Sequence, residues 1–134
     1  MRRSLWILSA VFFWVMLVAM AKPPGAEVPV PEIDFKATVR DDQDVMTKVS
    51  RVSWEGNIFF TGVRGKGVVT ISFEKIRKVS SLGGGNGTRS DFQITLKNGD
   101  VVAVSLDNEE RFLGVTNFGT YRIASKNIKE IVFE

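Results

Sequence analysis

The sequence predicts an all-β fold of about eight to ten short strands, built from two copies of one unit that pack as a sandwich or close as a barrel. Two observations carry this prediction. The stretch from Val52 to Ser81 recurs without a gap from Val104 to Phe133. Apolar and polar residues alternate with a period of two along much of the chain after residue 32, and no amphipathic helix of useful length interrupts them.

The internal repeat is supported by eight identities in thirty aligned positions, against about two expected from average residue usage. The identical pairs are Val52/Val104, Ser53/Ser105, Phe60/Phe112, Gly62/Gly114, Val63/Val115, Gly67/Gly119, Ile71/Ile123 and Ile76/Ile128. Upstream, DFKATVR (34–40) recurs as DFQITLK (91–97), with five extra residues between the blocks of the first copy. We therefore expect repeats at 33–82 and 88–134, joined by a Gly-rich linker at 83–87.

The segment 1–21 has the layout of a secretory signal peptide. Arg2 and Arg3 precede an apolar run, which ends in Ala19-Met20-Ala21. This pattern predicts an N-terminal signal helix that is cleaved after Ala21. An uncleaved membrane anchor is the alternative, because the apolar stretch from Leu5 to Ala21 is just long enough to span a bilayer.

Residues 22–32 hold all four prolines of the chain and predict an extended, semi-rigid linker. The remainder, 33–134, is predicted to fold as one domain. Each copy has only about 45 residues, a size that normally needs disulfides, a metal or oligomerisation to fold, and the chain has no cysteine. The two copies are therefore expected to share one core, and two small SH3-like barrels in tandem are the alternative.

The alternation places the strands one after another between short turns. The expected strands are 33–40, 50–54, 58–63, 69–73, 76–79, 92–96, 102–106, 112–115, 121–123 and 128–133. Asn98-Gly99 is a strong hairpin signal between two of them. The phase of the pattern predicts that Val52 and Trp54 point inward and that Ser53 and Ser105 point outward.

Composition excludes several classes of function. The chain has no cysteine and no histidine, which removes thiolate chemistry, the usual general base and the commonest zinc ligand. We expect no cofactor and no metal. Without Arg2 and Arg3, 16 basic side chains face 15 acidic ones, so the folded part lacks the basic excess of a nucleic-acid binder.

Two acidic segments offer oxygen ligands of the kind that calcium binds. Asp41, Asp42 and Asp44 lie close together, but they lack the spacing of a calcium loop and its glutamate. The same holds for a second acidic turn, 107–110. Solvated turns are therefore the preferred interpretation of both.

No catalytic arrangement can be picked out. The chain has no nucleophile elbow, and no flanked pair of carboxylates of the glycosidase type stands out. We therefore predict a protein that is not an enzyme. The recurring glycines Gly62, Gly67, Gly114 and Gly119 are interpreted as bends or bulges that let a sheet curl, rather than as points of close approach to a ligand.

One loop differs between the copies in a way that the fold does not demand. Arg64-Gly65-Lys66 in the first copy corresponds to the uncharged Thr116-Asn117-Phe118 in the second. Arg64 and Lys66 are therefore candidates for contact with an anionic partner, such as a membrane head group or an acidic polymer.

The two G-x-x-x-x-G segments (62–67 and 114–119), each followed by an apolar row, and the I-K-x-I segment at 128–131 resemble small exported bacterial all-β proteins of unknown function. This resemblance implies a location in the envelope and carries over no functional residue. We expect a periplasmic or secreted binding or scaffold module that contacts a protein partner through strand edges and loops. A carboxylate-based hydrolase of envelope polymers is one alternative. A domain anchored by its uncleaved N-terminal helix, which alone would involve a membrane, is the other.

Overall fold

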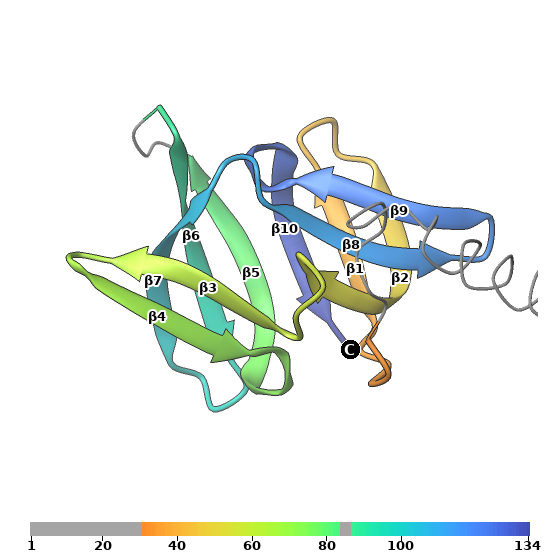
Figure 1. Ribbon diagram of the computed structural model, residues 1–134, viewed down its shortest axis with the longest axis horizontal. Coiled ribbons are helices and arrows are strands. Elements are labelled where there is room, and N and C mark those ends of the chain that lie inside the picture. Colours follow the sequence, from red (N-terminus) through yellow and green to blue (C-terminus); the bar gives the residue numbers. More distant parts are fainter. Residues whose placement is uncertain (1–30, 84–86) are drawn as a thin grey trace, which may run out of the picture.

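The structure, a computed structural model, describes residues 31–83 and 87–134. These residues form a single antiparallel sheet of ten strands (Figure 1). The strands are β1 (Ala37–Asp41), β2 (Met46–Trp54), β3 (Phe59–Arg64), β4 (Gly67–Ser72), β5 (Ile76–Gly83), β6 (Arg89–Leu96), β7 (Val101–Asp107), β8 (Arg111–Thr116), β9 (Gly119–Ala124) and β10 (Ile128–Phe133). Two short 3-10 helices, η1 (Phe73–Lys75) and η2 (Ser125–Asn127), precede β5 and β10. The predicted signal peptide and nearly all of the Pro-rich linker lie outside the described residues.

The same succession of elements occurs in both halves of the chain. β3, β4 and η1 have the same lengths and spacing as β8, β9 and η2. The first residues of β5 and β10, Ile76 and Ile128, continue this correspondence. The offset between these elements is the one at which the sequence repeats.

Each half of the chain (31–83 and 87–134) pairs its hairpin with a strand of the other half. The strand order is β4-β3-β7-β6-β5-β10-β1-β2-β8-β9, so the β3–β4 hairpin pairs with β7 and the β8–β9 hairpin pairs with β2. At the centre, β5 pairs with β10 and Val79 lies opposite its equivalent, Ile131. The halves are thus related by an approximate two-fold axis through this pair, and the two hairpins project at opposite ends of the molecule (Figure 1).

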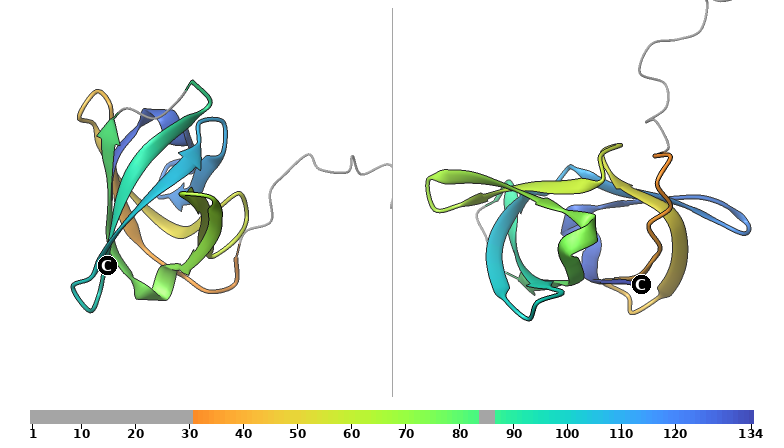
Figure 2. Two further views of the ribbon diagram at one scale, coloured as in Figure 1. Left: turned by 90° about the vertical axis from the view of Figure 1, so that its left-hand side faces the viewer. Right: turned by 90° about the horizontal axis from the view of Figure 1, so that it is seen from below.

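The predicted sandwich or closed barrel is wrong, whereas the all-β class and the number of strands are confirmed. The sheet curls around its core but stays open (Figure 2), and within the described residues β4 and β9 each have one strand neighbour. The tandem-barrel alternative is wrong as well, because each end of the sheet contains strands of both halves. Period-two alternation defines the faces of strands but not their partners, which is why it could not decide between these architectures.

An aromatic cluster drawn from both halves fills the curl of the sheet. The Phe60 ring lies 5.0 Å from Trp54, 5.0 Å from Phe73 and 6.1 Å from Phe112, measured between ring centroids. Phe60 and Phe112 occupy equivalent positions, and their planes differ by only 10°. Phe133 closes the cluster. Trp54 is buried as predicted. Buried apolar residues of both halves form one cluster.

Glycine is required where each hairpin crosses onto the other half. A Cβ atom added at Gly62 would lie 2.9 Å from the carbonyl oxygen of Ser105 on β7. One added at Gly114 would lie 2.9 Å from the Cβ of Val49 on β2. These two glycines therefore serve neither a simple bend nor a ligand: they let two backbones approach each other.

A bulge in β2 overturns the predicted orientation of Ser53. The register of β2 against β8 shifts between Ser50 and Ser53, and Arg51 has a φ of 48°. As a result Val52, Ser53 and Trp54 are buried in succession instead of alternating. The Ser53 hydroxyl is satisfied inside the fold, where it accepts the Gly56 N–H at 3.2 Å.

The strand pairing also corrects the alignment of the upstream blocks. Val39 pairs with Ile131 in the second half. Val79 is the equivalent of Ile131 in the first half, and it pairs with Ile94. Val39 therefore corresponds to Ile94. The alignment of DFKATVR with DFQITLK instead matched Val39 with Leu96, two positions further on. The first half therefore has three extra residues rather than five, and they lie at the β2 bulge.

Substituting the crossing glycines should destabilise the fold. We expect Gly62→Ala and Gly114→Ala each to lower the free energy of unfolding by about 1 to 3 kcal/mol, because a methyl group must displace backbone or a rigid Cβ. Gly67→Ala is the matched control, since its added Cβ would meet only the Arg64 carbonyl oxygen at 3.6 Å. Urea unfolding of the three variants measures the difference, and equal stabilities would contradict the crossing model.

The two halves should unfold as one unit. Trp54 is the only tryptophan after residue 14 and reports on the shared core, while far-ultraviolet circular dichroism reports on the whole sheet. In urea the two signals should have one midpoint. A chain that ends at Gly84 should be unfolded, because its β3–β4 hairpin has no β7 to pair with. A cooperative transition of that fragment alone would refute the shared core.

Candidate functional site

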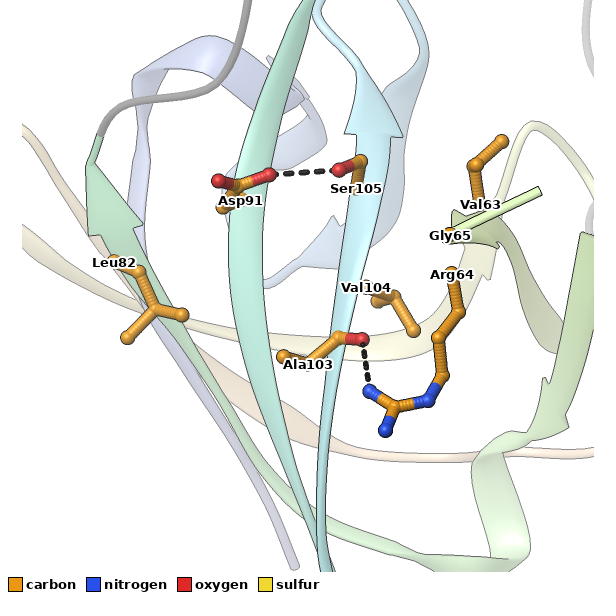
Figure 3. Close-up of a pocket in the computed structure, with 8 residues that line it drawn as sticks. All are labelled: Val63, Arg64, Gly65, Leu82, Asp91, Ala103, Val104 and Ser105. Atoms are coloured by element: carbon orange, nitrogen blue, oxygen red, sulfur yellow. Dashed lines mark hydrogen bonds between the residues drawn. The ribbon is translucent and has the colours of Figure 1, made fainter. Parts of the chain in front are cut away.

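The two predicted contact residues, Arg64 and Lys66, lie at the tip of the β3–β4 hairpin, but only one of them is bonded within the fold. The guanidinium of Arg64 turns back over the sheet, and its Nη1 donates to the Ala103 carbonyl oxygen on β7 at 3.1 Å (Figure 3). Lys66 is exposed and makes no hydrogen bond or ion pair within the described part of the chain. The structure therefore does not bring the two cations together around one anion site.

Arg64 closes a fork in the sheet. β3 and β7 share a single registered pair, Val63 with Ser105, and the strands separate beyond it. Ala103 is the next β7 residue whose backbone faces β3, because ladder positions alternate along a strand. The Arg64 guanidinium thus supplies the donor that a strand N–H would supply if the ladder continued.

A shallow pocket of about 210 Å³ lies at this fork, on the outer face of the sheet. It is lined by Val63, Arg64, Gly65, Leu82, Asp91, Ala103, Val104 and Ser105 (Figure 3). Its polar wall is already engaged. The Ser105 hydroxyl donates to Asp91 Oδ1 at 2.7 Å, and the Ser105 carbonyl oxygen accepts Arg89 Nη2 at 3.1 Å. Leu82 lies on the other side of β6 and β7 from Val63 and Arg64 (Figure 3).

Sequence reasoning missed this pocket. Leu82 and Asp91 flank the chain between the halves, and Ala103 is far from Arg64 in sequence. Only the exchange of the β3–β4 hairpin onto β7 brings them together. The one available signal was the absence of a counterpart to Arg64 in the second copy.

The outer edge of β4 is the other feature that could receive a ligand. In a hairpin with a two-residue turn, the pair that flanks the turn is hydrogen-bonded, and the next position on each strand faces away. Val68, Thr70 and Ser72 therefore direct their N–H and C=O groups away from β3. Val68 is 72% exposed, and no residue of β4 is charged.

The opposite edge of the sheet is protected in a way that β4 is not. On β9, the position equivalent to Thr70 is Arg122. A charged side chain on an edge strand discourages the addition of another strand. Of the two outer edges, β4 is therefore the one open to strand addition.

The Asp41–Asp44 turn uses its carboxylates within the fold. Asp41 Oδ1 accepts the N–H groups of Gln43 at 2.9 Å and Val45 at 3.0 Å. Asp44 accepts a hydrogen bond from Lys129 Nζ at 2.8 Å, and this contact holds the pKa of Asp44 below its ordinary value of 3.8. Residues 31–83 and 87–134 contain no group of three or more acidic side chains arranged to hold a metal ion.

Glu110, in the second acidic turn, is a carboxyl group whose pKa is raised by its surroundings. Partial burial raises its pKa above the ordinary value of 4.5, and repulsion from Asp107 and Glu55 adds to the rise. The indole Nε1 of Trp54 is buried without a partner in hydrogen-bonding geometry, and its attraction for the carboxylate opposes the rise only in part. Glu110 is not among the residues that line the pocket.

In the described residues, these features define an all-β domain in which each end of the sheet combines strands of both halves, with an uncharged strand edge at β4 and a shallow outer pocket at the fork. The chain belongs to a family of uncharacterised proteins, whose family model matches residues 31–134. No curated protein and no solved structure matches the chain significantly. In the part of the chain that the structure describes, no helix is both long and apolar enough to cross a membrane.

Replacing Glu110 should stabilise the protein at neutral pH. A carboxyl whose folded-state pKa is raised is most compatible with the fold below its unfolded pKa, and that advantage is lost as the pH rises through the folded value. Glu110→Gln removes a partly buried charge, so we expect its melting temperature at pH 7 to exceed that of the wild type, with the difference vanishing below about pH 4.

The neighbouring Glu109→Gln is the control, because Glu109 is an exposed partner of Lys126 and should change the melting temperature little. Thermal melts of the three proteins from pH 3.5 to pH 8 measure the effect. A Glu110→Gln variant that is less stable than the wild type at pH 7 would contradict the assignment.

Proposed function

We propose that the protein is an exported, non-enzymatic binding module that receives an extended segment of a partner protein on the free edge of β4. The single observation that carries this proposal is the exposed, uncharged edge at β4, in contrast to the β9 edge at the other end of the sheet, which carries Arg122. The export part rests on Arg2, Arg3 and Ala19-Met20-Ala21, which favour secretion to the periplasm or the exterior.

The chemistry of the edge defines the kind of segment that fits. An added strand would hydrogen-bond to the backbone of Val68, Thr70 and Ser72, each bond contributing about 0.5 to 1.5 kcal/mol net. Because β4 carries no charge, an uncharged segment rich in β-branched residues suits it. Lys66, at the tip, would add attraction for an acidic residue at the end of that segment.

The surroundings of two carboxyl groups, Asp91 and Glu110, favour binding over hydrolysis. Asp91, the carboxylate in the pocket, is engaged by the Ser105 hydroxyl. Glu110, whose raised pKa would suit an acid catalyst, belongs to the turn between β7 and β8 rather than to the pocket lining. The pocket at the fork has one carboxylate among its lining residues, that of Asp91.

We further propose that the two halves are duplicated units. Support comes from the recurrence of β3, β4 and η1 as β8, β9 and η2 at one constant offset, and from the pairing of the equivalent residues Val79 and Ile131 at the centre of the sheet. A duplication also accounts for the eight identities between the copies.

Strand addition on β4 can be blocked with one substitution. Thr70→Pro removes an outward N–H group, and proline is tolerated where that group faces solvent at a sheet edge. A photo-crosslinking amino acid at Val68 in the native envelope should capture a partner through an extended, uncharged segment. A synthetic peptide of that segment should bind the purified protein and lose on the order of tenfold in affinity with Thr70→Pro.

The other edge provides the matched controls. Arg122→Pro on β9 is the equivalent change and should leave peptide binding unchanged, as should Thr70→Val, which keeps the N–H group. Thermal melts establish that the variants remain folded. A peptide that binds the wild type and the Thr70→Pro variant equally well, or a crosslink that forms from Thr120 on β9 but not from Val68, would overturn the proposal.

A further inference from the structure

The β8–β9 hairpin presents a large aromatic side chain to solvent. Phe118 is 80% exposed at the tip of this hairpin. The turn is internally braced, because the Thr116 hydroxyl accepts the Phe118 N–H at 3.2 Å and donates to the Gly119 carbonyl oxygen at 2.7 Å. A braced turn loses little conformational entropy when its tip is bound, so Phe118 is preorganised for insertion into a partner.

The pocket at the β3–β7 fork has the size and walls to receive an aromatic ring. Its volume of about 210 Å³ exceeds the roughly 150 Å³ of a cavity that accommodates benzene. Val63 and Leu82 offer apolar walls, and Leu82 is 54% exposed. The hydrogen bond to Ala103 holds the Arg64 guanidinium in place, where it can contact the face of a ring.

We propose that Phe118 of one copy inserts into the fork pocket of a second copy, so that the protein associates head to tail. The β8–β9 hairpin and the fork lie at opposite ends of the sheet, so Phe118 cannot reach the pocket of its own chain (Figure 1). The contact is heterologous, because each copy donates its ring at one end and accepts a ring at the other.

The departures from two-fold symmetry give each copy one ring and one pocket. At the equivalent hairpin tip, Phe118 is replaced by Lys66, and the residue equivalent to Arg64 is Thr116. Thr116 bonds within its own hairpin and does not reach across to β2. The exposed Phe118 ring and the fork pocket, which have no counterparts in the described residues of the other half, are thus complementary to each other. This inference is independent of the β4 edge, which lies on the other side of β3 from the fork.

Sedimentation velocity on the full exported chain, from micromolar to millimolar concentration, tests the contact. The wild type should show an average mass that rises with concentration and continues beyond the dimer. Phe118→Ala removes the ring and Leu82→Asp places a charge in the pocket, so each should lower the association constant by at least about tenfold. A 1:1 mixture of these two variants keeps one intact ring and one intact pocket, so it should form a dimer and stop there.

Matched variants separate this contact from general loss of apolar surface. Val101 is 54% exposed, like Leu82, but does not line the pocket, so Val101→Asp should associate as the wild type does. Phe118→Tyr keeps the ring and should also associate. A wild type that stays monomeric at millimolar concentration, or a mixture of the two variants that stays monomeric, would overturn the proposal. Association that requires an added protein or lipid vesicle would assign Phe118 to that partner instead and would also overturn it.

Discussion

The close backbone approach at Gly62 and Gly114 is the constraint on which the rest of the structure depends. At these two points a hairpin leaves its own half and crosses onto a strand of the other, which a side chain at either position would obstruct. The exchange places Phe60 against Phe112 and draws the core from both halves. Apolar residues of both halves are thereby joined in one buried cluster.

Because the two halves share one arrangement of strands, the equivalent positions at which their residues differ indicate where the molecule could contact a partner. Equivalent positions in the core keep similar residues, such as Phe60 and Phe112, because both must fill the same curl. On the outer face and edges the equivalents diverge: Thr70 corresponds to Arg122, and Lys66 to Phe118. Packing does not require these differences, so they are where the interaction surfaces of the molecule are to be sought.

The sequence was sufficient to predict local features and insufficient for those that depend on pairing. Period-two alternation predicted the strands and the burial of Trp54, because it reports directly on which face meets the core. It was wrong for Ser53, since a bulge shifts the phase without leaving a mark in the pattern. The fork pocket was out of reach because strand exchange unites Leu82 with Ala103, and Arg64 was noticed only as a loop without a counterpart.

The exchanged hairpins also impose an order on the formation of the sheet. During synthesis, the β3–β4 hairpin is complete before β7 exists, and β2 must wait for β8, which belongs to the other half of the chain. Such long-range pairing folds slowly, because the loop entropy must be overcome before the contacts form. The sheet therefore cannot be completed before β8, β9 and β10 have been synthesised. Such a delay would suit a polypeptide that, as proposed above, is threaded through a membrane before it folds.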